Sequence, residues 1–164
     1  MIPITRISPA PIASTTTTSS GRTFEVSAIL DAPRDRVFAL SQDYTRRLLW
    51  DPFLKEARLI DGATAALGAK AWCVSKGGFG METEYVSFEP PNVAAVRMTR
   101  GPFFIKAFAA SWRFSDAGDA TRVSFKYFLD LRRPFGFLMP LMLRAFARET
   151  QGRIDGLQRY FERG

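Results

Sequence analysis

The chain has 164 residues, 46% of them hydrophobic, and a formal net charge of +7. That length and composition predict one globular domain with a substantial core rather than a disordered chain. The sequence holds no histidine and a single cysteine, Cys73, which excludes an internal disulfide, a multi-cysteine metal site and any catalytic pair built on histidine. We therefore expect no metal and no cofactor, and the lone cysteine favours a reducing compartment, the cytoplasm.

Strands are predicted where apolar and polar residues alternate, and helices where apolar residues recur every 3.6 positions. Glycine and proline turn signals separate the segments, and the short loops between strands indicate an antiparallel meander. In chain order we predict a strand at 23–30, helices at 31–43 and 44–49, strands at 55–59, 69–76, 81–88, 93–99, 104–114 and 122–131, and a long helix from between Phe137 and Pro140 to near Glu162. Residues 1–21 are expected to be a flexible leader, and residues 22–164 a single domain.

The positive charge is concentrated at the two ends of the chain. Residues 1–22 and 132–164 hold arginines in excess of acids, whereas the middle is nearly neutral. No long basic run or familiar nucleic-acid motif accompanies them, so a solvated basic helix face is favoured over nucleic-acid binding. The longest apolar segment, Pro134 to Leu143, ends at Arg144 and is too short to span a membrane.

The long final helix carries one charged pair on its apolar side. Met142 and Phe146 mark that side, Arg153 projects near its centre, and Glu149 lies at its edge, four residues before Arg153. This spacing permits an ion pair. In one interpretation Arg153 packs its stem and reaches water with its head. In the other, the pair faces a cavity and orients a polar group of a ligand.

A strand, two short helices, a meander and a long final helix follow one another in the order of a helix-grip fold. Loosely matching segments in that order are "FEVSAILDAPRDRVFALSQDYTRRLLWDPFLKEARLIDG" (24–62), "EPP" (89–91), "SWRF" (111–114) and "TRVSFKYFL" (121–129). Together they resemble the START-like superfamily (SRPBCC), the polyketide cyclase/dehydrase and lipid-transport group, over residues 23–162. The resemblance implies an α+β helix-grip fold, in which a curved antiparallel sheet of six or seven strands wraps around a long C-terminal helix, with two short helices after the first strand.

The resemblance also implies an apolar cavity between sheet and final helix. Members of the superfamily include lipid carriers, plant hormone receptors, coenzyme Q-binding proteins, aromatase/cyclases and ring-hydroxylating oxygenase domains, and the oxygenases need histidine metal ligands that this chain lacks. We favour binding of a hydrophobic small molecule such as a lipid, an isoprenoid or a polyketide-like compound. The alternative is a cyclase or dehydratase that uses the same cavity without a metal, with no catalytic residue assigned. The fold alone does not choose between them.

The candidate ligand-binding residues are aromatic, apolar and charged side chains that could face this cavity: Trp50, Trp72, Tyr85, Arg97, Phe108, Trp112, Phe125, Tyr127, Met142, Phe146, Glu149 and Arg153. Trp50 either closes the cavity mouth or fastens the short helices to the sheet. Arg97 alternates with apolar neighbours and has solvent as its default, but facing inward it would pair with an acidic or enolate oxygen. Asp51 is interpreted as a turn residue and Cys73 as a small buried apolar residue.

A third hypothesis concerns the segment "RRPFGFLMPLMLRAF", residues 132–146, which combines arginines with phenylalanine, leucine and methionine. Such a segment could make transient contact with an anionic membrane surface or with another protein. Exposure of Phe135, Phe137 and Met139 as one patch would favour this hypothesis, and their burial against the sheet would oppose it. The sequence leaves the oligomeric state open.

Overall fold

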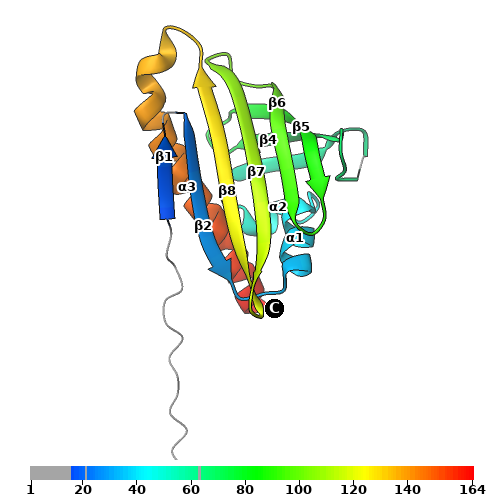
Figure 1. Ribbon diagram of the computed structural model, residues 1–164. Helices are drawn as coiled ribbons and strands as arrows, with labels where there is room; N and C mark the ends of the chain where they lie inside the picture. Colours follow the sequence, from blue (N-terminus) through cyan, green and yellow to red (C-terminus); the bar gives the residue numbers. More distant parts are fainter. Residues whose placement is uncertain (1–15, 21, 63) are drawn as a thin grey trace, which may run out of the picture.

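The computed structural model describes residues 16–20, 22–62 and 64–164, with residues 16–20 described in their backbone only. One sheet and one long helix dominate it (Figure 1). The elements in chain order are β1 (Thr16–Ser20), β2 (Thr23–Leu30), α1 (Arg34–Gln42), α2 (Arg47–Trp50), β3 (Leu54–Leu59), η1 (Ile60–Gly62), β4 (Lys70–Ser75), β5 (Gly80–Glu89), β6 (Val93–Arg100), β7 (Ile105–Ala117), β8 (Ala120–Leu131), η2 (Phe135–Leu138) and α3 (Met139–Arg163). This confirms the predicted order of elements.

The sheet in the described part of the chain has eight strands in the order β1-β2-β8-β7-β6-β5-β4-β3, and every neighbouring pair is antiparallel. The sequence predicted six or seven strands. The additional one is β1, which pairs with β2 and comes from the segment expected to be a leader. That segment is rich in threonine, a β-branched residue that favours strands. Residues 1–15 and 21 of the expected leader lie outside the described residues.

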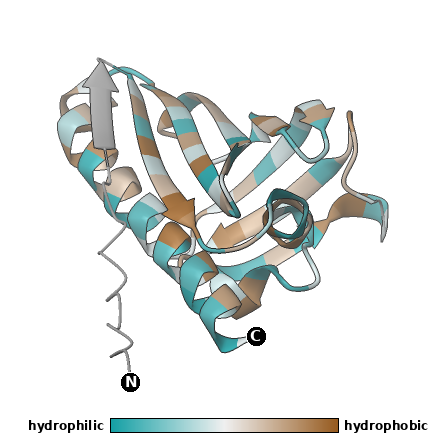
Figure 2. Cartoon of the chain, turned by 60° about the horizontal axis from the view of Figure 1, so that its bottom comes forward, coloured by the Kyte–Doolittle hydropathy of each residue, from teal (hydrophilic) through white to brown (hydrophobic). Residues whose placement is uncertain are grey.

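Helix α3 packs against β2 and β8 and against the short helix α2, as a helix-grip fold requires. Figure 2 shows the sheet bent into a trough, with α3 alternating between hydrophilic and hydrophobic residues. The helix begins at Met139 with Pro140 in its first turn, where proline is tolerated. Its polar side faces away from the sheet, and Ile154 and Leu157 are buried on the other. No helix in the described ranges is both long and apolar enough to cross a membrane.

Side-chain alternation places the inward residues of β8 as predicted. Phe125, Tyr127 and Leu129 are almost fully buried, whereas Phe128 between them is exposed. The pairing of β7 with β8 contains a bulge between Ile105 and Ala107. A bulge adds one residue and shifts the alternation of the strand. Lys106 therefore lies exposed, although simple alternation along β7 would place it on the same face as Phe108 and Trp112.

Close contact between α2 and α3 depends on Gly156. This residue is buried, and a Cβ atom built on it would clash with the backbone carbonyl group of Trp50. Every other residue type carries that Cβ, so the two helices could not approach as closely with any of them. The contact brings the corner after α2 next to the middle of α3, where Arg153 lies.

Candidate functional site

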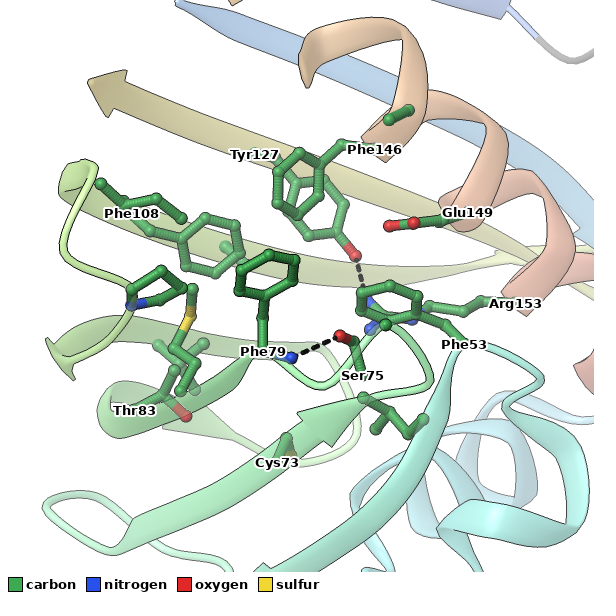
Figure 3. A pocket seen from close by; sticks show the side chains of 18 of the residues that line it. Phe53, Cys73, Ser75, Phe79, Thr83, Phe108, Tyr127, Phe146, Glu149 and Arg153 are labelled. Atoms are coloured by element: carbon green, nitrogen blue, oxygen red, sulfur yellow. Dashed lines mark hydrogen bonds between the residues drawn. The ribbon is translucent and has the colours of Figure 1, made fainter. Parts of the chain in front are cut away.

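A cavity of about 490 Å³ lies between the concave face of the sheet, η2 and α3. Its walls are mostly apolar, and Figure 3 shows side chains from the sheet and from α3 converging on it. Among the residues that line it, Gly77, Phe79 and Ala145 are exposed to solvent and mark the opening. The cavity predicted from the sequence is therefore present, and it opens between the β4–β5 turn and α3.

The structure brings most of the candidate residues together around this cavity. The ones that line it are Tyr85, Phe108, Trp112, Tyr127, Met142, Phe146, Glu149 and Arg153. They come from β5, β7, β8 and α3, so the inward faces of these elements were identified correctly from alternation and helical spacing.

Trp50 and Phe125 are buried but do not line the cavity, contrary to the expectation that they would face it. Both pack behind Trp112, with ring centroids 5.9 Å from it for Trp50 and 4.2 Å for Phe125. Trp50 thus fastens the α2 corner to the sheet rather than closing the mouth. Its indole N–H has no hydrogen-bond partner among the described residues.

Trp72 and Arg97 lie on the outer face of the sheet, so neither faces the cavity, again contrary to expectation. Trp72 alternates with the inward residues of β4, and its ring covers Gly80 on the neighbouring strand. The Arg97 side chain is 63% exposed and pairs with Glu84 at 3.2 Å. Its alternation with inward-facing Val96 decides its direction, so the solvent default was the correct one.

One end of the cavity is polar, and we call Arg47, Asp51, Tyr127, Glu149 and Arg153 the polar end. Four of these residues line the cavity, and Asp51 bonds to two of the four. Asp51 is 2% exposed and lies between two arginines. Its carboxylate accepts from Arg47 Nε at 2.9 Å and lies 3.2 Å from Arg153 Nε. Arg153 Nη1 donates in turn to the Tyr127 hydroxyl at 3.1 Å, as Figure 3 shows. Bonds among α2, β8 and α3 therefore fix this end of the cavity.

Asp51 has two roles, of which the sequence predicted one. Its Oδ1 accepts from the backbone N–H of Phe53 at 3.1 Å, the turn contact expected of an aspartate at this corner. Burial by itself would raise the pKa of Asp51, but Arg153 and Arg47 outweigh burial and hold that pKa below its ordinary value. Asp51 is therefore a buried counterion as well as a turn residue.

Glu149 and Arg153 do not form the ion pair that their spacing permits. Arg153 turns to Asp51, 102 positions earlier in the chain, and its side chain is only 12% exposed. It therefore does not reach out to solvent. Glu149 lines the cavity beside it, and burial, with a contribution from Asp51, raises the pKa of Glu149 even though Arg153 opposes this. The interpretation of charges facing a cavity is the one that the geometry supports.

Uncharged polar groups line the cavity close to the polar end. The Tyr85 hydroxyl donates to Gln42 Oε1 at 2.7 Å, and burial, aided by Tyr44, raises the pKa of Tyr85. Cys73, expected to be simply buried, also lines the cavity, and burial raises the pKa of its thiol. The raised pKa values favour the uncharged forms of Tyr85 and Cys73, so the groups that decide the charge of the site are the two arginines, Asp51 and Glu149. The described residues contain no group of three or more potential metal-ligating side chains.

A chain of ring contacts joins the loops near the opening. Phe79 contacts Phe104 at 5.6 Å, Phe104 contacts Phe103 at 5.5 Å, and Phe103 contacts Phe135 at 5.6 Å. We call these four residues the aromatic rim. Phe79 is 56% and Phe103 is 75% exposed.

The membrane hypothesis for residues 132–146 is met only in part. Phe137 is 75% exposed, but Phe135 and Met139 are partly buried and pack beside Leu129 and Leu131. The segment is therefore shared between the molecular surface and the end of the core near η2.

Sequence reasoning missed the residues of the polar end that α2 contributes. Arg47 lies in the helix predicted at 44–49 and was not among the candidate residues, although its position four residues before Asp51 is the spacing of a helical ion pair. That spacing was the available signal. Gln42 and Tyr44 also line the cavity, and they were missed because they lie at the end of α1 and in the turn before α2, where strand alternation gives no direction.

Comparison with known proteins places the chain among proteins of this architecture. A family model described as polyketide cyclase/dehydrase and lipid transport matches residues 21–162. A comparison with curated proteins finds no match. The solved structure of TTHA0849 from Thermus thermophilus is similar with a TM-score of 0.72 at 17% identity, covering 84% of this chain and 94% of that one.

Two larger solved structures are also similar. They are the di-domain ARO/CYC proteins StfQ of the steffimycin pathway, with a TM-score of 0.73 at 8% identity, and BexL of the BE-7585A pathway, with a TM-score of 0.70 at 12% identity. The match covers 86% of this chain in each case, and 51% of StfQ and 46% of BexL. This chain therefore spans about half the length of either di-domain protein, and at these identities the likeness shows the shared fold.

Proposed function

Because the chain belongs to the polyketide cyclase/dehydrase and lipid-transport family, we propose that it binds a hydrophobic small molecule, such as a lipid, an isoprenoid or a polyketide-like compound. The observation that carries this proposal is the cavity itself. Its volume of about 490 Å³ and its largely apolar wall with a few polar groups are those of a small-molecule site. The lone cysteine favours a reducing compartment, and we keep the cytoplasm as the proposed location.

Two variants on neighbouring positions of β6 test where the ligand binds. Val96 lines the cavity and Arg97 points outward, so Val96→Trp fills the cavity while Arg97→Trp adds the same side chain to the surface. We expect Val96→Trp to abolish binding of the neutral fluorescent probe Nile red, and to abolish retention of small molecules seen by mass spectrometry of the purified protein. Arg97→Trp should behave as the original chain. Unchanged binding by a folded Val96→Trp variant, checked by circular dichroism, would contradict the proposal.

A second candidate function is a cyclase or dehydratase, and the convergence of polar groups in the cavity favours it. An enzyme of this kind needs a donor to polarise a carbonyl group and a base to remove a neighbouring proton. The Tyr127 hydroxyl and Arg153 lie together as donors, and Glu149 lies beside them with a raised pKa. Glu149 would take the α-proton as the new carbon–carbon bond forms, and the Tyr127 hydroxyl would give its proton to the resulting alkoxide. The proton on Glu149 would then pass to the Tyr127 oxygen, which restores both groups.

This second candidate is tested with a synthetic poly-β-ketone, whose cyclised products are followed by chromatography. We expect turnover above the spontaneous rate and a loss of at least about 100-fold in Glu149→Gln, the usual size of a general-base contribution. Products that form at the same rate with and without the protein would leave binding as the function.

Contact with an anionic membrane is a further proposal about how a ligand reaches the cavity. Exposed aromatic residues at the aromatic rim lie close in sequence to Arg100, Arg132 and Arg133, which are also exposed. Apolar rings together with arginines favour the surface of anionic bilayers. The chain should therefore sediment with phosphatidylglycerol vesicles more than with phosphatidylcholine vesicles, and equal sedimentation would contradict the contact.

A further inference from the structure

At the polar end, two buried positive groups share a single bonded carboxylate. Two buried guanidinium groups, those of Arg47 and Arg153, bond to a carboxylate, and in the described ranges it is the same one, Asp51. Arg47 directs a further N–H to the backbone carbonyl of Ser41 at 3.0 Å. A buried charge is stable when opposite charge and hydrogen bonds compensate it. Glu149 lines the cavity nearby but forms no ion pair with either guanidinium group in the described part of the chain, so the cavity side of Arg153 can take one more anionic group when Glu149 is protonated.

The Tyr127 hydroxyl adds a donor to this capacity. Its oxygen accepts from Arg153, and its own proton has no acceptor in the part of the chain that the structure describes. Tyr127 is 1% exposed, and its ring stacks on Phe24 with centroids 4.9 Å apart and an interplanar angle of 9°. The ring is thereby held in place, and the hydroxyl lies in the cavity wall. A buried tyrosine hydroxyl without a partner for its proton is suited to an oxygen of a ligand.

We propose that the ligand is an acidic amphipathic molecule, whose carboxylate or enolate oxygen is held by the Tyr127 hydroxyl and Arg153 while its apolar body lies against Phe108, Met142 and Phe146. This inference rests on the proposed function and names the chemical class of its ligand. A cationic head group would be repelled by the two arginines, and an alcohol would accept hydrogen bonds without compensating their positive charge. Of the three head groups, only an acid both accepts the hydrogen bonds and compensates the charge.

Glu149 is the group that works against an anionic ligand, and it sharpens the test. Ionised, it repels a ligand carboxylate; protonated, it is another donor for the same oxygen. Its raised pKa moves it toward the protonated form. Replacing it with the neutral, similarly shaped glutamine removes the repulsion and keeps a donor.

Three probes of equal chain length test the proposal by isothermal titration of the full chain: decanoate, 1-decanol and decylammonium. We expect decanoate to bind at least about tenfold more tightly than 1-decanol, because hydrogen bonds to a charged group are the stronger ones. Tyr127→Phe and Arg153→Met should each reduce that preference, and Glu149→Gln should increase it. Arg97→Met, which removes an arginine outside the cavity, should leave it unchanged.

The outcomes separate this inference from the proposed function. Equal binding of decanoate and 1-decanol, or tighter binding of decylammonium, would overturn the acidic-ligand inference and leave the apolar cavity site intact. Absence of binding by all three probes and by Nile red would contradict both. Tyr127→Phe removes only one oxygen, so it keeps the test decisive even where Arg153→Met does not fold.

Discussion

At the polar end of the cavity, charged and hydroxyl groups from three parts of the chain bond to one another, whereas the aromatic rim is built from ring contacts between residues that solvent reaches. Asp51 is 2% exposed and Phe103 is 75% exposed. Buried polar groups contribute to stability as a network, and losing one leaves the others unpaired. Exposed rings contribute little to the free energy of unfolding, so their removal should change it little. The two regions should therefore respond differently to substitution. Changes at the polar end should lower the free energy of unfolding, whereas changes at the rim should alter contacts with other molecules and leave that free energy nearly unchanged.

The largest effect is expected from Asp51→Asn. This change leaves Arg47 and Arg153 buried without a carboxylate, and removing one partner of a buried ion pair typically costs about 3–5 kcal/mol. The free energy of unfolding in urea measures it. Asp43→Asn is the control, since Asp43 pairs with Arg46 at 3.7 Å near the surface and its loss should cost less than about 1 kcal/mol. Similar costs for the two variants would remove the contrast between buried and exposed pairs.

The same carboxylate should make stability depend on pH in the acid range. The pKa of Asp51 in the folded protein lies below its unfolded value of 3.8. Its contribution is thus complete above pH 3.8 and is lost as the pH falls through the lower folded-state pKa. Urea midpoints measured from pH 5 downward should fall more steeply for the original chain than for Asp51→Asn. Parallel profiles would show that Asp51 does not carry this dependence.

A smaller effect is expected from Tyr85→Phe. It removes the hydroxyl that donates to Gln42 and leaves a buried amide oxygen without its partner, at a cost of about 1–2 kcal/mol. Thermal unfolding followed by circular dichroism measures the change. Tyr44→Phe is the matched control, because the contact from Tyr85 to the Tyr44 hydroxyl is long, at 3.4 Å. A larger loss of stability in Tyr44→Phe than in Tyr85→Phe would show that the Tyr44 hydroxyl, rather than the bond from Tyr85 to Gln42, makes the greater contribution.

The smallest effect on stability is expected beside the aromatic rim. Phe137→Ser should change the free energy of unfolding by less than about 0.5 kcal/mol, because the ring is 75% exposed. By comparison, Phe24→Ala should cost about 3–5 kcal/mol, since Phe24 is buried and stacks on Tyr127. If Phe137→Ser costs as much as Phe24→Ala, then the segment around η2 belongs to the core.

Local patterns in the sequence predicted the fold and most of the cavity wall. Alternation identified the inward face of β8, and helical spacing placed Met142 and Phe146 on the cavity side of α3. Such patterns report direction relative to neighbouring residues, and a bulge such as the one at Lys106 breaks them without a clear signal.

Contacts between distant segments could not be predicted in the same way. Asp51 and Arg153 are separated by 102 positions, and no pattern in either segment predicts that the two side chains are in contact. Trp50 shows the same limit, since whether it closes the cavity or packs behind Trp112 depends on how α2 rests on the sheet. The sequence therefore predicts which residues face inward more reliably than which of them meet.

The absence of a side chain at Gly156 has a consequence for any redesign of this protein. The carbonyl group of Trp50 occupies the space that a Cβ at position 156 would need, so the separation of α2 and α3 is set by a residue without functional groups. To alter ligand selectivity, the side chains that line the cavity could be substituted one strand at a time. Gly156 would have to be kept, because it sets how closely α2 and α3 approach and therefore the distance between Arg47 on α2 and Arg153 on α3.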